Sequence, residues 1–252
     1  MNDLISHYDL EYKDGLRLDL HLPEVDKFDL FIYFHGGGLT AGKRGGVEVF
    51  ANTLAARGIA TASVEYRLYP DAKFPDFIED GAESVAWLKA HIGNFGRCKR
   101  IFVGGSSAGG YISMMLCFDG RFLSKFGLEP TDIDAYIHDA GQPTSHFNVL
   151  KELGKDSRRV IVDETAPLFF VGTAERYSPM LFIVSDNDMF ARYEQTMLMV
   201  KTLNHFGHTD NVFVEVMNGK HCKYVYQADE NGDGVLGNVI LSFLDKINQQ
   251  DI

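Results

Sequence analysis

The polar and apolar positions along the chain follow two different periods, which alternate from one segment to the next. Leu30–His35 (LFIYFH) is almost continuously apolar, which is typical of a strand buried on both faces of a sheet. Pro75–Ile92 instead carries apolar residues every three or four positions, which predicts a helix with one buried face. Alternation of these two kinds of segment predicts an α/β fold, with a mostly parallel central sheet and helices on both faces.

The first strands and one long connection are expected to depart from this regular alternation. Alternating patterns near His7–Tyr12 and Leu16–Leu22 predict an antiparallel hairpin. The stretch 141–178 is long for a connection between strands, and we expect a small cap there, within a single domain that spans residues 1–252. The other predicted elements are strands at Ile59–Tyr66, Ile101–Gly105, Ala135–Ala140, Leu181–Ser185 and Val212–Met217, and helices at Val47–Arg57, Ala108–Cys117, Ala191–Phe206 and Val239–Ile247.

Composition narrows the class of partner. The chain has 252 residues and a formal net charge of −11, and no cluster of Lys and Arg offsets this acidity. Neither nucleic acid nor an anionic membrane surface is therefore an expected partner. Met1–Tyr8 lacks the pattern of a secretory signal, no apolar stretch approaches the length of a membrane span, and three scattered cysteines suggest neither a disulfide framework nor a zinc site. We expect a cytoplasmic protein and leave its oligomeric state open.

A candidate nucleophile lies in the segment Gly-Ser-Ser-Ala-Gly at 105–109, which matches the pattern G-x-S-x-G. The segment lies directly between a predicted strand and a predicted helix, where a sharp turn can present a serine as a nucleophile. The glycines permit a tight turn, and the positive end of the helix favours negative charge beside it. We predict that Ser107 is the nucleophile and that Ser106 points away from the site. The alternative interpretation is a glycine-rich turn with a passive serine.

Candidate donors for an oxyanion hole follow the apolar strand that ends in His35–Gly38 (HGGG). A tetrahedral intermediate of acyl transfer carries negative charge on its oxygen, which preorganised backbone N–H groups stabilise. We expect the N–H groups of Gly37, Gly38 and Ala108 to form this hole, and the His35 side chain to hold the loop in place. The alternative interpretation is an ordinary flexible glycine loop.

A base and an acid are expected after the later strands, because the nucleophile of such a site is followed along the chain by the acid and then by the histidine. His221 follows the last predicted strand and is the expected base. Asp186 and Asp188 both follow the strand before it, and Asp188 is favoured because a loop position lets it reach back toward the histidine. His205 and His208 fall at a helix end, where we expect them to face solvent.

Taken together, these motifs resemble one known family. HGGG at 35–38, Val64–Pro70 (VEYRLYP) and GSSAG at 105–109 are similar to the motifs of the α/β-hydrolase esterases and lipases related to hormone-sensitive lipase. The similarity runs from about residue 16 to the last helix. It implies the α/β-hydrolase fold, a Ser–Asp–His triad and an HGGG oxyanion hole, with these roles falling on Ser107, Asp188, His221, Gly37 and Gly38.

The chain departs from the family in two respects. Ser185 stands where the family often has glycine, and the HGGG strand begins too early in the chain for the long N-terminal cap of the larger members. The second departure suggests an open site, similar to that of small bacterial esterases that act on acetyl or feruloyl groups of plant polysaccharides.

The resemblance implies a serine carboxylesterase that hydrolyses short-chain acyl esters, such as acetyl esters, through an acyl-enzyme. The expected partner is a small-molecule ester, for which an acylated carbohydrate is one candidate, and no metal or organic cofactor is expected. One alternative is an amidase on the same scaffold, such as an arylformamidase or a small peptidase. Another is a ligand-binding protein without catalytic activity, although such proteins typically lack a member of the triad.

Other chemistry-bearing residues are expected to be structural. Asp229–Gly234 matches the first half of a calcium-binding EF-hand loop, but Ile240 stands where the loop needs its bidentate Glu. The segment therefore predicts a turn before the last helix. We expect Cys222 to be a packed neutral thiol, and Tyr224 and Tyr226 to line the core or a pocket.

Overall fold

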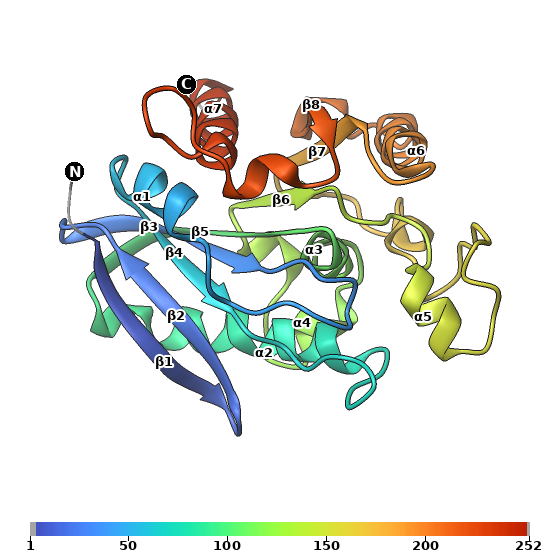
Figure 1. Cartoon of the computed structure of the whole chain (residues 1–252), viewed down its shortest axis with the longest axis horizontal. Coiled ribbons are helices and arrows are strands. Elements are labelled where there is room, and N and C mark those ends of the chain that lie inside the picture. Colours follow the sequence, from blue (N-terminus) through green and yellow to red (C-terminus); the bar gives the residue numbers. More distant parts are fainter. Residues whose placement is uncertain (1–3, 251–252) are drawn as a thin grey trace.

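The computed structural model of the chain describes residues 4–250 and contains one eight-stranded sheet (Figure 1). The first three residues of the N-terminal segment in which no secretory pattern was found lie outside this range. The strands lie side by side in the order β1-β2-β4-β3-β5-β6-β7-β8. They are β1 (Ile5–Lys13), β2 (Leu16–Leu22), β3 (Lys27–Phe34), β4 (Ile59–Val64), β5 (Arg97–Ser106), β6 (Ala135–Asp139), β7 (Met180–Asn187) and β8 (Val212–Lys220).

The sheet is mostly parallel, as predicted. Strands β4, β3, β5, β6, β7 and β8 pair in parallel, whereas β1 pairs antiparallel with β2 and β2 antiparallel with β4. The predicted hairpin at the N-terminal end is thereby confirmed. Because β3 and β5 to β8 run in the same direction, their carboxyl ends meet at one edge of the sheet, where α/β folds place their ligand sites.

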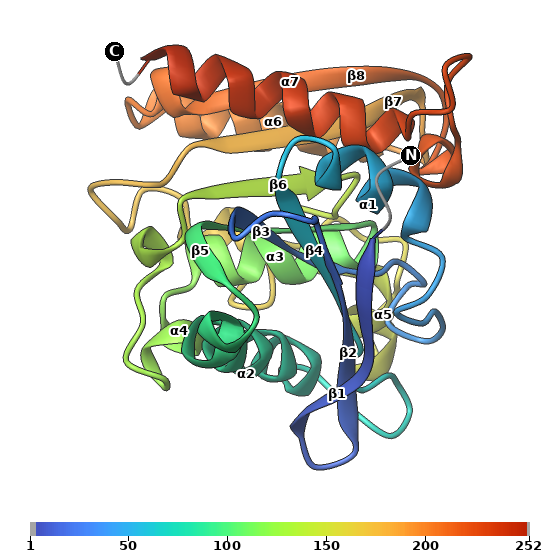
Figure 2. The ribbon, with the colours of Figure 1, turned by 90° about the vertical axis from the view of Figure 1, so that its left-hand side faces the viewer.

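Helices cover both faces of the sheet (Figures 1 and 2). Helices α1 and α7 share one apolar core with the sheet, and α2, α3 and α6 share the other. Figure 2 shows α2 and α3 on the side of β5 that lies away from α7. The helices are α1 (Glu48–Ala55), α2 (Asp76–His91), α3 (Ala108–Phe118), α4 (Arg121–Ser124), α5 (Phe147–Glu152), α6 (Arg192–His205) and α7 (Val235–Gln250).

Strand β3 illustrates how the sequence pattern leads to this layering. Leu30, Ile32 and Phe34 belong to the core beneath α2 and α3, and the intervening Phe31 and Tyr33 belong to the core beneath α1 and α7. Successive side chains of a strand point to opposite faces. A continuously apolar strand is therefore stable only where both faces are covered, and the HGGG loop that follows β3 consequently begins at a firmly held point.

The segment 141–178 contains elements that its sequence did not reveal. It holds the short helix α5 and a 3₁₀ helix at Pro167–Phe170, each too short to show a periodic pattern. The segment is held together by backbone bonds from Ser145 N–H to the Ile161 carbonyl and from Leu168 N–H to the Pro143 carbonyl, both 2.9 Å. That it caps the site, and that the whole chain is one domain, remain predictions.

Candidate active site

Three loops at the carboxyl edge of the sheet bring the predicted triad residues together. Ser107 follows β5, Asp188 follows β7 and His221 follows β8. His221 Nε2 lies 2.8 Å from Ser107 Oγ, and His221 Nδ1 lies 2.5 Å from Asp188 Oδ1. When Nδ1–H donates to the Asp188 carboxylate, Nε2 is left free to accept the Ser107 hydroxyl proton. The three side chains are thus placed for proton transfer, and their catalytic roles are taken up below as a proposal.

Ser107 occupies a strained turn between β5 and α3, within residues 105–109, which is called the nucleophile elbow below. Its backbone has φ 56° and ψ −109°, a conformation that L-residues rarely adopt and that costs of order 1–3 kcal/mol. The neighbouring glycines allow the turn to form against β3. A Cβ added to Gly109 would lie 1.9 Å from the Phe34 carbonyl oxygen, so no larger residue fits there. Because Gly109 has no side chain, the elbow can approach β3, the strand that leads into the HGGG loop.

Asp188 and Asp186 have different partners. Asp188 contacts His221, and its two oxygens also accept hydrogen bonds from the N–H groups of Met189 (2.7 Å) and Ser185 (3.2 Å). Burial raises the pKa of Asp188, but the hydrogen bond and charge of His221 outweigh it and hold that pKa below its ordinary value. Asp186 is exposed and accepts from Gly219 N–H at 2.8 Å. The geometry thus favours Asp188 as the acid, as the sequence did.

The end of β8, just before His221, is bonded to side chains of β7 at two successive residues. Asp186 holds Gly219, and Ser185 Oγ donates to the Lys220 carbonyl at 3.2 Å. Ser185 is the residue that replaces a common glycine of the family, and here its hydroxyl holds the residue next to the histidine. The sequence signalled that Ser185 was unusual but not what its side chain would contact.

The glycine loop after β3 adopts backbone conformations that require glycine. Gly37 has φ 124° and Gly38 has φ 65°, and both lie in the region that favours glycine. A Cβ on Gly36 would lie 3.4 Å from Ser107 Cβ, so the loop lies directly against the nucleophile elbow. Within the described residues, the N–H groups of Gly37 and Gly38 donate to no protein acceptor, which leaves them available to a bound oxyanion.

The third predicted donor lies at the first turn of α3. Ala108 is the first residue of that helix, so its N–H has no intrahelical acceptor. The same helix end carries partial positive charge. The predicted oxyanion hole of Gly37, Gly38 and Ala108 is therefore geometrically open, and its function stays a prediction.

His35 contacts the glycine loop and the core beneath it. Its Nδ1 lies 2.7 Å from the Gly36 carbonyl oxygen, and its ring stacks on Tyr66 with centroids 4.3 Å apart. Tyr66 in turn donates its hydroxyl to the His35 carbonyl at 2.7 Å. Burial lowers the pKa of His35, which keeps the ring neutral. These contacts agree with the holding role expected for this histidine.

The insertion also contacts the glycine loop, which the sequence did not predict. Asn148 on α5 donates from Nδ2 to the Gly38 carbonyl at 2.5 Å, and the Phe147 ring lies 3.7 Å from the position of a Cβ on Gly38. Because the Gly38 carbonyl is held by Asn148, the orientation of the peptide group between Gly38 and Leu39 is restrained. Nothing in the sequence around Asn148 predicts that its side chain bonds the glycine loop.

The contacts of Ser106 exclude it as the nucleophile, and the Cys222 thiol lies 3.7 Å from His221 Nε2, farther than Ser107 Oγ at 2.8 Å. Ser106 lies buried with its hydroxyl bonded to Tyr33 and Asp139 and not to His221, as expected for the x position of the motif. Burial raises the pKa of the Cys222 thiol well above its ordinary value, which agrees with the packed neutral thiol predicted there.

Neither a metal site nor a membrane-crossing element is found in the part of the chain that the structure describes. Residues 4–250 contain no group of three or more His, Cys, Asp or Glu side chains placed to hold a metal ion. Every helix in that range is too short or too polar to cross a membrane. The Asp229 carboxylate accepts from the N–H groups of Asn231 (2.8 Å) and Asp233 (3.0 Å), so the predicted turn before α7 is confirmed.

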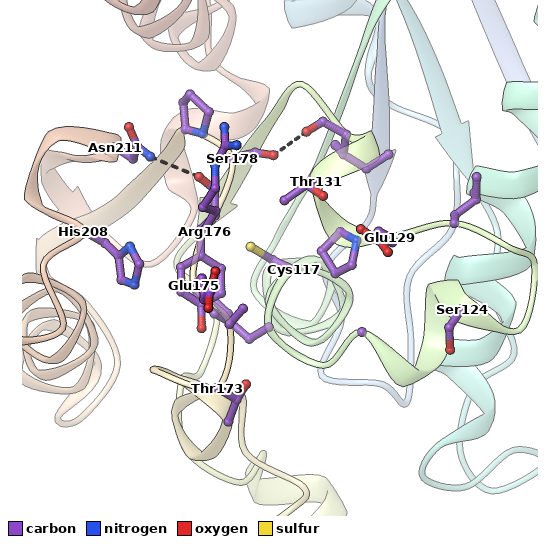
Figure 3. Close-up of a pocket in the computed structure, with 18 of the residues that line it drawn as sticks. Cys117, Ser124, Glu129, Thr131, Thr173, Glu175, Arg176, Ser178, His208 and Asn211 are labelled. Atoms are coloured by element: carbon purple, nitrogen blue, oxygen red, sulfur yellow. Dashed lines mark hydrogen bonds between the residues drawn. The ribbon is translucent and has the colours of Figure 1, made fainter.

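A large cavity lies at the opposite edge of the sheet, away from the triad. It has a volume of about 1250 Å³ and is bounded by the end of α3, the entry to β6 and the segment that leads into β7 (Figure 3). Two of its polar side chains are hydrogen-bonded to main-chain carbonyls: Asn211 donates to that of Tyr177 and Ser178 to that of Ile133. His208 packs edge-on against Tyr177 at 4.7 Å and is half-buried, so the prediction that it faces solvent is wrong, whereas His205 is exposed.

Comparisons with known proteins agree with this architecture. A family model described as the alpha/beta hydrolase fold matches residues 31–137, a range that includes the HGGG loop and the elbow. The chain is 38% identical to "Probable carboxylesterase 6" of Arabidopsis thaliana over 100 residues, which cover 36% of this chain and 30% of that protein. It is 35% identical to "Probable carboxylic ester hydrolase LipM" of Mycobacterium tuberculosis over 136 residues, or 50% of this chain and 32% of that protein. The matches thus span about a third of these relatives.

Solved structures match over nearly the whole chain. A truncated carbohydrate esterase from gut microbiota superposes with a TM-score of 0.77 at 16% identity, covering 95% of this chain and 96% of that one. A propionate-bound esterase from Thermogutta terrifontis superposes with a TM-score of 0.75 at 17% identity, covering 97% and 94%. These comparisons confirm the predicted α/β-hydrolase fold and the resemblance to its esterases and lipases.

Proposed function

Because the chain has the α/β-hydrolase fold and resembles its carboxylesterases, we propose that it is a serine carboxylesterase in which Ser107, His221 and Asp188 form the catalytic triad. The observation that carries the proposal is the pair of contacts made by one imidazole, 2.8 Å to Ser107 Oγ and 2.5 Å to Asp188. Both lie within hydrogen-bonding reach, which is the geometry that general-base activation of a serine requires.

The proposed reaction proceeds in two steps. Ser107 Oγ attacks the ester carbonyl carbon while His221 Nε2 takes the hydroxyl proton, and the carbonyl oxygen becomes an oxyanion beside the N–H groups of Gly37, Gly38 and Ala108. His221 then gives its proton to the leaving alcohol, and Ser107 is left acylated. A water molecule, deprotonated by His221, hydrolyses the acyl-enzyme in the second step. Asp188 holds the imidazole in the reactive tautomer and stabilises the imidazolium.

We propose short-chain acyl esters, such as acetyl esters, as the substrate class, with an acylated carbohydrate as a candidate. Two likenesses support this: one structural neighbour is named a carbohydrate esterase, and another binds propionate. The acidic chain, with a formal net charge of −11, also favours a neutral ester over an anionic one, because like charges repel as they approach.

Hydrolysis of p-nitrophenyl acetate, butyrate and octanoate tests the proposal, with p-nitroacetanilide as the matching amide. We expect turnover that falls as the acyl chain lengthens and that drops on the order of 10⁶-fold in Ser107→Ala. Turnover of the amide but not of the esters would instead identify an amidase. A Ser107→Ala variant that keeps the wild-type rate would exclude the proposed nucleophile.

A further inference from the structure

A buried carboxylate beside the triad belongs to none of the proposed catalytic groups. Asp139 is the last residue of β6 and is 1% exposed. Its Oδ2 accepts a hydrogen bond from Ser106 Oγ at 2.5 Å, and its Oδ1 accepts one from the Tyr224 hydroxyl. Its backbone carbonyl accepts the Ser107 N–H at 2.7 Å. Asp139 therefore holds Ser106 and Ser107 in the nucleophile elbow and also bonds Tyr224, which lies in another element.

That tyrosine belongs to the histidine's loop. Tyr224 lies in the 3₁₀ helix Lys223–Tyr226, which begins two residues after His221. The hydrogen bonds of Asp139 thus connect the loop that carries the proposed base to the turn that carries the proposed nucleophile. The His221–Ser107 hydrogen bond joins these two parts directly, at the reacting atoms. The Asp139 side chain provides a second connection, beneath the reacting atoms.

Both parts that Asp139 connects contain strained backbone. Ser107 has φ 56°, and Cys222, between His221 and the 3₁₀ helix, has φ 50°. Non-glycine residues keep such conformations only where surrounding contacts over-determine them. For Ser107 these contacts include the Asp139 carbonyl and the bond made by its neighbour Ser106. For Cys222 they include Tyr224, whose hydroxyl is fixed on the Asp139 carboxylate.

The network is closed on its remaining side by β3. Tyr33 donates its hydroxyl to Ser106 Oγ at 2.9 Å, so Ser106 accepts from Tyr33 and donates to Asp139. Burial raises the pKa of Asp139 to about 6, and the hydrogen bonds from Ser106 and Tyr224 oppose that rise. The two hydroxyl groups that donate to it therefore favour the ionised carboxylate. An ionised carboxylate supplies one acceptor oxygen to each of the two hydroxyls, whereas an amide has a single oxygen and an NH₂ group in place of the other.

We propose that Asp139 is a positioning residue that sets the distance and orientation between Ser107 and His221, by holding Ser106 on one side and Tyr224 on the other. The inference rests on the proposed esterase function and deepens it. The Asp139 side chain bonds neither Ser107 Oγ nor the His221 ring. It acts through the elbow and the histidine loop, and its removal allows these two parts to move relative to each other. Misplacement of reacting groups by about 1 Å can cost on the order of 100-fold in rate.

The test compares Tyr224→Phe, Ser106→Ala and Asp139→Asn with wild type on p-nitrophenyl acetate. We expect kcat to fall about 10- to 100-fold with KM changed less than about twofold, because the interaction lost is between the catalytic groups and not with substrate. The rate at which paraoxon phosphorylates Ser107 should fall by the same factor. In an Asp139→Asn background, either Tyr224→Phe or Ser106→Ala should have little further effect, because the amide offers a single acceptor oxygen to the two hydroxyl groups.

Ser113→Ala is the matched control. Ser113 is equally buried on α3, and its hydroxyl bonds the buried His138, the residue before Asp139, at 2.9 Å. This hydrogen bond reaches neither the elbow nor the histidine loop. We expect Ser113→Ala to lower the melting temperature comparably to Tyr224→Phe while keeping kcat within about twofold of wild type. If Ser113→Ala lost as much kcat as Tyr224→Phe, the role of Asp139 would be structural only.

The outcomes separate this inference from the proposed function. Folded Tyr224→Phe and Ser106→Ala variants with wild-type kcat and paraoxon rates would overturn the positioning role and leave the triad intact. A wild-type protein that neither hydrolyses the ester nor reacts with paraoxon would overturn both. Should Asp139→Asn fail to fold, the two milder variants decide the matter, since each removes a single hydroxyl group.

Discussion

The two edges of the parallel sheet differ in how their polar groups are used. At the carboxyl edge, side chains from β5, β6, β7 and β8 and their loops bond one another across long sequence separations, and Ser107 and Cys222 adopt strained backbone. The amino edge holds a cavity of about 1250 Å³, where the side chains of Asn211 and Ser178 also bond residues far away in the sequence, but bond main-chain carbonyls and not other side chains. Strain and convergent hydrogen bonds, and not cavity volume, therefore identify the candidate active site.

The comparison also explains why side chains from different loops bond one another at the carboxyl edge. Parallel strands end there together, so each loop starts from a fixed point on the sheet and can meet its neighbour. The amino edge receives the loops that enter the strands, and these must mainly satisfy their own backbone groups. The following predictions test this difference, beginning with the largest expected effect.

Replacement of Asp186 and Asp188, one at a time, tests which of the two is the catalytic acid. Asp188→Asn should lower kcat about 10⁴-fold, because an amide at this position favours the wrong imidazole tautomer. Asp186→Asn should keep kcat within about threefold, because its amide oxygen can still accept from Gly219 N–H. Both rates are measured on p-nitrophenyl acetate. A reversed order of the two effects would transfer the acid's role to Asp186.

Gly37→Ala tests the glycine loop. Its Cβ would lie 1.9 Å from the Ala41 carbonyl oxygen, at a φ of 124°, so the loop must move and its N–H donors with it. We expect kcat to fall about 10²- to 10³-fold, as on loss of an oxyanion donor. Gly45→Ala is the control, since its Cβ would contact nothing within 4 Å and its φ is not positive. Equal kinetics for the two variants would contradict a role for this loop in the oxyanion hole.

Asn148→Ala tests the link between the insertion and the glycine loop. Loss of the bond to the Gly38 carbonyl should lower kcat about tenfold, because the peptide planes around Gly38 become less restrained. Thr40→Ala removes a weaker, exposed hydrogen bond to the Gly37 carbonyl at 3.4 Å and should change kcat by less than about twofold. Steady-state kinetics of both variants decide whether α5 supports the site. An unchanged kcat in Asn148→Ala would restrict α5 to packing.

The raised pKa of Asp139 predicts a stability effect with a definite sign. In the folded protein this pKa is about 6, above the value of about 3.9 expected in the unfolded chain. Between these values the folded state binds more protons than the unfolded state, so the contribution of Asp139 to stability falls as pH rises from about 4 to 6. Denaturant unfolding should therefore show that the free energy of unfolding of wild type, relative to that of Asp139→Asn, decreases as pH rises over this range. Above this range the difference between the two proteins should be constant. A difference independent of pH would contradict the raised pKa.

The smallest effect is expected at the amino edge. Glu175→Ala and Arg176→Ala change two exposed side chains that line the large cavity. We expect kcat/KM on p-nitrophenyl acetate to remain within about twofold of wild type, because surface changes away from the site have small effects. A tenfold loss in either variant would show that the amino edge contributes to the reaction, and the contrast between the two edges would no longer hold.

Much of the fold was predictable because its determinants are local. The continuously apolar β3, the helical spacing of α2 and the turn before α7 can each be recognised within a short window of residues. The motif around Ser107 was predictable for the same reason, since the glycines that permit the strained elbow lie within two residues of it. The preference for Asp188 over Asp186 followed from distance beyond the strand, and the contact with His221 agrees with it.

The positions of Asp139, Asn148 and Ser185 were decided only by the tertiary structure. Each makes its key hydrogen bond to a residue more than thirty positions away, and no periodic pattern or turn preference specifies such a partner. The sequence by itself determined which segments form strands, where the backbone can tolerate strain, and which residues can act as nucleophile, acid and base. Which buried groups hold these residues in register depends on how the strands are ordered in the sheet, because only that order brings the ends of β5, β6, β7 and β8 to one edge.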